Sequence, residues 1–283
     1  MEKRFPSKII LIVLSTFMSV MAPFITHPAR ASGLDFAVIH PGQPGTTADA
    51  WPVMAEMGNY VRKKAGLEQE VTGGYFNSTD SAIDFLDNSI PEWGIVSLEF
   101  FLEYAEKYRM TPVASTRPGG ESGDIWRLAV GKDSPDDWRM LTGKVRGTML
   151  YHGEVSVCLL FAGAEKLPFS LEGTSRPLRS IRAVSRGRLS GVILDRMQFT
   201  GLQGVSLASR VKVIHESDRL PASPVIWFGR PGKQSEGLVK ILMEMKADPG
   251  ASGLLKLLQT DGFGPPDRDL PGLREKINVC LSR

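Results

Sequence analysis

Cysteine and histidine are scarce in this sequence of 283 residues, which holds two cysteines and four scattered histidines. The two cysteines, Cys158 and Cys280, lie far apart along the chain and can build neither a disulfide framework nor a zinc-ligand cluster. We therefore expect no metal ion and no cofactor. The pair could form one disulfide in an oxidising compartment if their Cα atoms lie within about 7 Å of each other, a condition that the sequence leaves open.

Long hydrophobic runs are absent after the first 31 residues, so no later segment is apolar enough to cross a bilayer. Residues 1–31 begin with three basic side chains in the first eight positions, continue with an apolar run and end in Ala-Arg-Ala. This order is typical of a secretory signal peptide, and it predicts export to the periplasm with cleavage after Ala31. The alternative is a retained N-terminal helix, which Pro23 and the short apolar run disfavour.

An excess of charge of one sign is lacking as well. The whole chain has a net charge of +3, but residues 1–31 contain four basic residues and one acidic residue, so the chain from Ser32 onward is neutral. A neutral domain lacks the basic footprint that nucleic-acid binding usually needs, so we expect no nucleic-acid partner. Catalytic motifs such as Gly-x-Ser-x-Gly and His-Glu-x-x-His are missing too. The sequence therefore predicts a protein that is not an enzyme.

What the sequence does contain is a regular alternation of short apolar strands and helices. Thr46 or Thr47 can cap a helix whose apolar residues recur every three or four positions until Gly66 ends it, and Ser78 starts a second helix. Three such alternations within about 80 residues predict an α/β sheet with parallel strands. The expected strands are 34–39, 68–75, 93–97 and 110–114, with a third helix over 98–108.

The rest of the chain continues the alternation. Residues 78–97 and 175–195 both show a capped helix, a small turn, an apolar strand and a polar end, as two similar lobes in one chain would. The expected strands here are 125–130, 145–151, 189–194, 211–214 and 221–228, and the expected helices are 156–164, 175–185, 235–246 and 254–260.

Several stretches together resemble a known family. They are Trp-Gly-Ile-Val-Ser at 93–97 with the helix and strand that follow, Leu-Thr-Gly-Lys-Val-Arg-Gly at 141–147, and residues 183–195 and 215–224. Their order and spacing resemble the substrate-binding proteins of phosphate, phosphite and phosphonate ABC importers. The resemblance covers about residues 34–262.

The resemblance implies an α/β architecture, the two-lobed type 2 periplasmic binding protein fold, in which each lobe is a mostly parallel sheet flanked by helices and two crossing strands join the lobes. Lobe one would comprise residues 32–124 and 217–283, and lobe two residues 125–216. The implied function is the capture of a small polar ligand, a phosphonate- or phosphate-like oxyanion, by a monomer that serves an ABC permease. The alternative is a periplasmic sensory or accessory protein that signals to a membrane partner.

Physical chemistry places the ligand at the carboxyl ends of the strands, because loops and helix N-termini line the crevice of an open α/β sheet there. Following the expected strands to their ends gives the candidate ligand-binding residues, which are His40, Gly42, Ser97, Glu99, Tyr151, His152, Gly153, Glu154, Ser156 and Asp195. Hydroxyls and backbone N–H groups at a helix start can hold an oxyanion with the help of the helix dipole. The predicted site therefore includes the helix start within residues 151–156.

Glu154 departs from the family pattern, which has a serine-threonine-serine run at this helix start. A carboxylate there would oppose an anionic ligand, because two unit charges about 4 Å apart interact by roughly 4 kcal/mol at an effective dielectric constant near 20. Glu154 could instead stabilise the N-terminus of its own helix. Both interpretations stay open at the level of the sequence.

Overall fold

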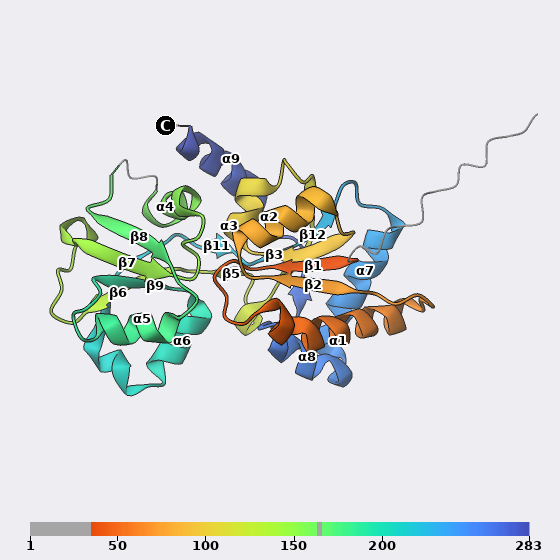
Figure 1. Cartoon of the computed structure of the whole chain (residues 1–283), viewed down its shortest axis with the longest axis horizontal. Helices are drawn as coiled ribbons and strands as arrows, with labels where there is room; N and C mark the ends of the chain where they lie inside the picture. Colours follow the sequence, from red (N-terminus) through yellow and green to blue (C-terminus); the bar gives the residue numbers. More distant parts are fainter. Residues whose placement is uncertain (1–34, 163–165, 283) are drawn as a thin grey trace, which may run out of the picture. The chain divides into compact units, whose positions relative to one another are not determined.

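The computed structural model describes residues 35–162 and 166–282, so the predicted signal peptide at 1–31 lies outside the described residues. The described residues all belong to one compact unit. This unit contains a six-stranded sheet, a five-stranded sheet and a small two-stranded sheet (Figure 1). We call the six-stranded sheet with its helices lobe one and the five-stranded sheet with its helices lobe two.

Lobe one has the strand order β13-β4-β12-β3-β1-β2. The pairings of β1 with β2 and β3 are parallel, whereas β12 is antiparallel to β3 and β4, and β13 is antiparallel to β4. Strands β1 to β4 therefore run in one direction and β12 and β13 in the other. The strands are β1 (Phe36–Ile39), β2 (Gly73–Phe76), β3 (Trp93–Val96), β4 (Met110–Thr116), β12 (Pro224–Phe228) and β13 (Phe263–Gly264).

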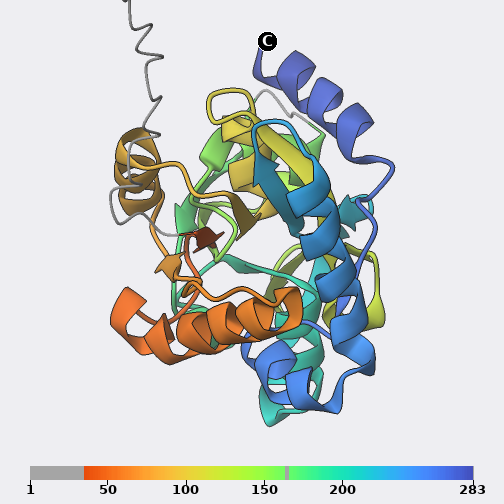
Figure 2. The same ribbon diagram turned by 90° about the vertical axis from the view of Figure 1, so that its right-hand side faces the viewer.

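Alternate residues of these strands face two separate apolar layers. In β1, Phe36 and Val38 belong to one buried cluster, and Ala37 and Ile39 belong to another. Such a period of two is expected when helices cover both faces of a sheet. The first cluster includes residues of α1 (Thr47–Ala65), α7 (Lys233–Glu244) and α8 (Ser252–Leu257). The second includes residues of α2 (Thr79–Asn88) and α3 (Leu98–Tyr104). The first group of helices lies on one side of the sheet and the second group on the other (Figure 2).

The ends of α1 follow the sequence prediction. Thr46 and Asp49 form a capping box, in which the Asp49 N–H donates to the Thr46 Oγ1 at 3.1 Å and the Thr46 N–H donates to the Asp49 carboxylate at 2.9 Å. The helix ends at Gly66, which has the left-handed conformation with φ of 66°. Both ends are local features, which explains why the sequence alone predicts them.

Lobe two has the strand order β10-β6-β9-β7-β8, and only β6 runs against the other four. The β6 residue Ala129 packs toward α5 (Pro177–Val184) and α6 (Arg196–Gln203), whereas Leu128 packs toward α4 (Gly153–Phe161). Helices therefore cover both faces here too. The strands are β6 (Arg127–Gly131), β7 (Gly143–Gly147), β8 (Phe169–Gly173), β9 (Gly191–Leu194) and β10 (Val211–Glu216).

Two short strands carry the chain between the lobes. β5 (Gly123–Asp124) leads from lobe one to lobe two, β11 (Leu220–Pro221) leads back, and the two pair antiparallel. They are the two crossing strands expected from the sequence. The expected lobe boundaries at 124/125 and 216/217 fall beside these connections, and they remain our proposal for the units that move.

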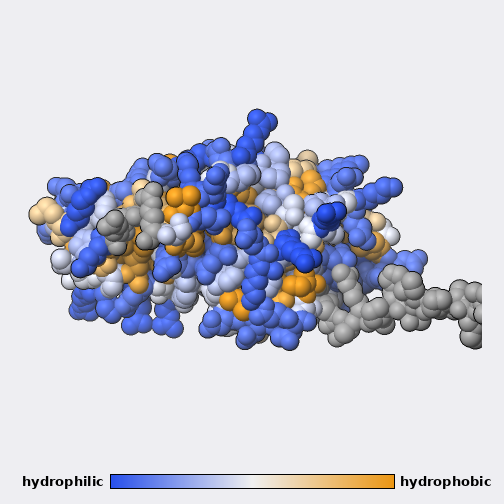
Figure 3. Space-filling view, turned by 90° about the horizontal axis from the view of Figure 1, so that it is seen from above, coloured by the Kyte–Doolittle hydropathy of each residue, from blue (hydrophilic) through white to orange (hydrophobic). Residues whose placement is uncertain are grey.

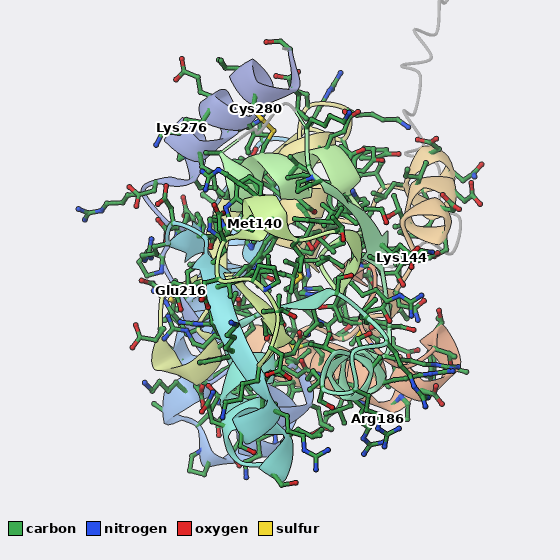
Figure 4. All side chains as sticks on the ribbon, turned by 90° about the vertical axis from the view of Figure 1, so that its left-hand side faces the viewer. Met140, Lys144, Arg186, Glu216, Lys276 and Cys280 are labelled. Carbon is green, nitrogen blue, oxygen red and sulfur yellow. A yellow bond between two sulfur atoms is a disulfide. The ribbon has the colours of Figure 1, made fainter. Side chains whose placement is uncertain are left out.

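The last helix, α9 (Leu270–Leu281), follows the final strand of lobe one but contacts α4 of lobe two. Cys280 on α9 forms a disulfide with Cys158 on α4, with the Cα atoms 6.1 Å apart (Figure 4). The pairing that the sequence left open is thus made. The same buried cluster contains residues of α3, α4 and α9. We call this contact of three helices the apolar seam.

Some predicted elements are wrong in extent or were missed. The strand expected over 145–151 ends at Gly147, because the chain turns at 148–151 to enter α4, which begins earlier than expected at Gly153. Four elements, β8, β13, α6 and α9, are not among those expected from the sequence. The α6 sequence contains glycine and threonine, which are weak helix formers, and the helix begins where Asp195 caps it.

The surface gives no sign of an extended apolar face in the view of Figure 3, where hydrophobic residues are scattered among hydrophilic ones. Within the part of the chain that the structure describes, no helix has the length and hydropathy to span a bilayer.

Candidate functional site

A cavity of about 100 Å³ lies where the two lobes and the crossing strands meet. Several of its lining residues directly follow the carboxyl end of a strand: His40 follows β1, Ser97 follows β3, Thr148 follows β7 and Asp195 follows β9. This is the place at which open α/β sheets bind ligands. The complete lining is His40, Pro41, Gln43, Ser97, Leu98, Glu99, Pro118, Asp124, Trp126, Thr148, Met149, Asp195, Pro221, Ala222 and Ser223.

The start of α3 forms the wall on the side of lobe one. Ser97 is the N-cap of this helix, and its Oγ accepts a hydrogen bond from the Phe100 N–H at 3.3 Å. Capping fixes the first helical turn, which carries Glu99. Glu99 is only 5% exposed and lines the cavity, so its carboxyl group is held in a largely dry position.

The start of α6 forms the wall on the side of lobe two. Asp195 caps this helix and accepts a hydrogen bond from the Gln198 N–H at 2.7 Å, while the Gln198 amide donates to the Thr148 Oγ1 at 2.9 Å. Asp124, on the crossing strand β5, accepts from the Arg196 N–H at 2.9 Å. Three carboxyl groups from three elements therefore line one cavity.

Burial changes the titration of these groups. It raises the pKa of Glu99 to about 7 and the pKa of Asp195 to about 6, since a dry site disfavours the charged form. His152 opposes this rise at Glu99 and Asp195 adds to it, while Asp124 raises the pKa of Asp195. Burial also raises the pKa of Asp124, against the opposing effects of Arg196 and Arg127. The cavity is thus acidic and electrostatically coupled.

None of these three carboxyl groups forms an ion pair with a residue that the structure describes. His40 supplies no charge either, because burial lowers its pKa to about 4 and leaves the imidazole neutral at pH 7. When these acids ionise, the cavity lining therefore carries negative charge without a directly paired cation among the described residues.

A second cavity of about 300 Å³ adjoins the first. The two share His40, Gln43, Pro118, Asp124, Asp195 and Ser223. Away from these shared residues, the second cavity is lined partly by apolar and aromatic side chains, among them Val53, Met54, Tyr75 and Leu257. A solute larger than the first cavity therefore has space to extend between polar and apolar walls.

Four of the predicted ligand residues come together in the first cavity: His40, Ser97, Glu99 and Asp195. The other six line neither of the two adjoining cavities; they are Gly42, Tyr151, His152, Gly153, Glu154 and Ser156. The part of the predicted site within residues 151–156 therefore lies outside the interlobe cavity.

Gly42 and Tyr151 contact each other across the two lobes. Gly42 has a φ of 84°, and a Cβ atom there would lie 2.3 Å from the Thr148 carbonyl oxygen and 2.4 Å from the Tyr151 ring. The position accepts only glycine without a shift of these neighbours. Gly42 thus acts by letting the Tyr151 ring lie against the loop after β1.

His152 and Ser156 are used to hold α4 in place. The His152 side chain is 1% exposed, and its Nδ1 lies 2.5 Å from the Glu103 carboxylate of α3. The Nε2 of His152 lies 3.4 Å from the Thr79 Oγ1 of α2. Ser156 is fully buried and donates to the Met149 carbonyl oxygen at 2.7 Å. These polar groups therefore already have partners in the protein.

Glu154 and Gly153 are exposed in the first turn of α4. This placement agrees with the interpretation that Glu154 stabilises the N-terminus of its own helix. Glu154 lies outside both cavities, so its carboxyl group is not part of their lining.

Several lining residues are not among those predicted from the sequence, notably Asp124, Trp126, Thr148 and Ser223. Asp124 ends a polar loop, and nothing local shows that the crossing strands bury it. Thr148 falls within the strand expected over 145–151, but that strand ends before it, at Gly147. The pairing of β5 with β11, which brings Asp124 beside Leu220, is a long-range contact without a local signal.

Metal binding has no support in the described residues. Within residues 35–162 and 166–282, no group of three or more histidine, cysteine, aspartate or glutamate side chains is arranged to hold a metal ion.

Comparison with solved structures identifies the fold. The protein XAC2383 from Xanthomonas citri, bound to chloride, is similar with a TM-score of 0.68 and 15% identity over 89% of this chain and 99% of that chain. A binding protein component of an ABC phosphonate transporter from Pseudomonas aeruginosa has a TM-score of 0.62 and 17% identity over 87% of each chain. PhnD1 from Prochlorococcus marinus, in complex with methylphosphonate, has a TM-score of 0.65 and 12% identity over 88% of this chain and 98% of that chain.

No protein-family model matches the chain, and no curated protein matches it. The structural similarity therefore defines a class by fold: the chain has the two-lobed fold of type 2 periplasmic binding proteins. The fold class expected from the sequence is confirmed. The expected resemblance to phosphonate-binding proteins is confirmed at the level of the fold.

Proposed function

We propose that this chain is the exported solute-binding component of an ABC importer, which holds a small polar solute in the interlobe cavity and delivers it to a permease. The observation that carries the proposal is the cavity itself, because both lobes of this fold supply polar groups to it. Glu99 and Ser97 belong to lobe one, and Thr148 and Asp195 belong to lobe two.

A solute that touches both walls favours the closed arrangement of the lobes over an open one, because only the closed arrangement brings all of its contacts together. The closed form would then be the state that a permease recognises. The solute would contact the cavity near the starts of α3 and α6. We propose no catalytic step, and we propose that the protein acts as a monomer.

The disulfide between Cys158 and Cys280 supports an extracytoplasmic location, since disulfides persist in oxidising compartments such as the periplasm. The proposed signal peptide at residues 1–31 would bring the chain there. The fold is also that of periplasmic binding proteins.

Thermal unfolding in the presence of candidate solutes tests the proposal. A solute that binds only the folded protein should raise its stability by about 2.7 kcal/mol at a hundredfold excess over the dissociation constant. Native mass spectrometry of the protein purified from its own host should detect the bound solute. The absence of a bound molecule and of any stabilisation across anions, cations and zwitterions would contradict the proposal.

The choice of membrane partner is tested separately. Capture from solubilised host membranes should recover an ABC permease. Recovery of a sensor kinase, with no permease, would favour the sensory or accessory alternative.

A further inference from the structure

We propose that the solute carries a positively charged group, a protonated amine or a guanidinium, which the carboxyl groups of Glu99, Asp124 and Asp195 bind together. This inference rests on the proposed function, because it names the solute class of the same interlobe cavity.

The first argument is the convergence of three carboxyl groups. Glu99 comes from α3, Asp124 from β5 and Asp195 from the start of α6, and all three line the same cavity of about 100 Å³. These elements belong to lobe one, to a crossing strand and to lobe two. A cation placed between the three carboxyl groups would be attracted by lobe one, by the crossing strand and by lobe two, and would so favour the closed arrangement of the lobes.

The second argument is the position of Glu99. Its side chain is 5% exposed and lines the cavity, and it forms no ion pair with a described residue. The groups in the protein that stabilise its charged form are the imidazole of His152, which acts electrostatically, its own backbone N–H and the hydroxyl group of Ser97. Burial disfavours the ionised form of this carboxyl group, and a cationic ligand beside it would restore the balance by stabilising that form.

The basic side chains around the cavity lie outside its lining and act partly on other groups and partly on the cavity acids. Arg127 pairs with Glu216 at 2.8 Å, and His152 contacts Glu103. Arg196 lowers the pKa of Asp124, so its influence falls on that carboxyl group. Among the described residues, neither Glu99 nor Asp195 forms an ion pair, and the effect of His152 on Glu99 does not outweigh burial.

The walls of the cavities also suit an organic cation. Trp126 lines the first cavity, and tryptophan faces attract ammonium and guanidinium groups. The adjoining cavity of about 300 Å³ has Val53, Met54 and Tyr75 in its lining, which would accommodate an apolar part of the same solute. The cavity lacks an unpaired basic side chain for an oxyanion among its lining residues.

An oxyanion could enter only if the carboxyl groups were protonated and donated hydrogen bonds to it. The two ligand classes therefore predict opposite responses to pH. Cation affinity should rise with pH as Glu99 and Asp195 ionise, whereas oxyanion affinity should fall. The groups that titrate around the cavity are Glu99, Asp124, Asp195 and His40, with Arg196, Arg127 and His152 nearby.

The experiment compares two sets of probes on the exported protein by calorimetry and thermal unfolding. The cationic probes are putrescine, agmatine, arginine and tetramethylammonium, and the anionic probes are inorganic phosphate, methylphosphonate and sulfate. We expect at least one cationic probe to bind, with an affinity that rises at least about tenfold between pH 5 and pH 8 and with release of protons on binding. The anionic probes should not stabilise the protein at pH 8.

Two variants test whether Glu99 and Asp195 bind the cationic probe. Glu99→Gln should weaken the binding cation at least about tenfold and flatten its pH dependence, since the amide keeps the shape of the side chain but not the charge. Asp195→Asn should weaken it too, and asparagine still caps α6. The matched control is Glu236→Gln, the same substitution in the exposed first turn of α7, which should leave affinity unchanged.

The outcomes separate the two proposals. Binding of phosphate or methylphosphonate that weakens as pH rises, with the cationic probes inert, would overturn the cation inference and leave the proposed function intact. Native mass spectrometry that identifies a co-purified solute without a cationic group would do the same. If neither set of probes binds and no solute co-purifies, the proposed function fails and the inference fails with it.

Discussion

The two lobes meet in two chemically different ways. At the interlobe cavity the facing groups are carboxyls, hydroxyls and an imidazole, and the three acids lack ionic partners among the described residues. At the apolar seam, α3, α4 and α9 share one buried hydrophobic cluster, and a disulfide and the contact of His152 with Glu103 reinforce it. Groups with satisfied partners hold the protein together, whereas buried charged groups without partners are the ones available to a ligand.

This comparison explains why the sequence directed attention to a helix start that lies outside the interlobe cavity. Both α4 and α6 follow a strand of lobe two, and both begin at its carboxyl end. The polar groups at the start of α4 already have partners in the protein, since His152 contacts Glu103 and Ser156 donates to the Met149 carbonyl oxygen. The start of α6 lies at the cavity through Asp195. Sequence proximity to a strand end does not distinguish these two cases.

The largest expected effect concerns the disulfide of the seam. Cys158 and Cys280 enclose a loop with a sequence separation of 122 residues. Loop-closure entropy for a cross-link of this length predicts that Cys280→Ser lowers the free energy of unfolding by roughly 5 kcal/mol. Denaturant titration with and without a reductant measures this value, and reduction should have no further effect on the variant. Equal stability of the oxidised and reduced wild type would contradict a structural role for the bond.

A smaller loss is expected from the apolar contact beside the disulfide. Ile277 on α9 is 2% exposed in the shared cluster, so Ile277→Ala should cost about 3 to 4 kcal/mol of unfolding free energy. Val279→Ala on the same helix is the control, because Val279 is 51% exposed and should change stability by less than about 0.5 kcal/mol. Similar losses in both variants would mean that α9 does not pack in the orientation seen here.

The stability of the ligand-free protein should change with pH in the direction that the buried Glu99 predicts. Its pKa is raised from 4.5 to about 7 on folding, so the folded state binds more protons than the unfolded state in this window, and stability falls as pH rises through it. Glu99→Gln removes this loss and should be more stable than the ligand-free wild type at pH 8 by on the order of 3 kcal/mol, with little difference at pH 4.

The comparison of variant and wild type at each pH is essential because His40 acts in the opposite direction. Its lowered pKa reduces stability as pH falls from about 6.5 to about 4. Wild-type stability alone would therefore combine opposing contributions. A difference between Glu99→Gln and wild type that does not change with pH would show that Glu99 is not buried as described.

The smallest effect is expected at the polar edge of the seam. Glu103→Gln removes the charge that faces His152 but keeps a hydrogen-bond acceptor, so it should cost about 1 kcal/mol. Glu56→Gln on the exposed side of α1 serves as the control for the substitution itself. Urea unfolding at pH 6 measures both. A loss well above that of the Ile277→Ala variant would place the strength of the seam in its polar contact rather than in its hydrophobic cluster.

Local signals made much of the fold predictable. Some features depend only on residues that are neighbours in the sequence, and a short segment is enough to predict them. They are the capping residues Thr46 and Ser78, the left-handed Gly66 and the apolar strand at 93–97. The same holds for Ser97 and Asp195, which cap helices at strand ends and reach the cavity.

Distant pairings were not predictable in the same way. The short strand β13 is defined by its pairing with β4, and α9 lies in the seam with a helix of the other lobe. Asp124 reaches the cavity because β5 pairs with a strand almost a hundred positions later in the chain, β11. Such contacts depend on the closure of long loops, for which a local pattern carries no signal.

The disulfide makes the mechanics of the lobes depend on the compartment. The chain passes between the lobes at β5 and at β11, and the bond from α9 to α4 adds a covalent crossing at a separate place, while Arg274 of α9 pairs with Glu106 beside α3 at 2.9 Å. A chain still in a reducing cytosol would lack that third tether. On the proposed function, the tether would form only after export, so a newly made copy would hold its two lobes together less firmly than the exported protein.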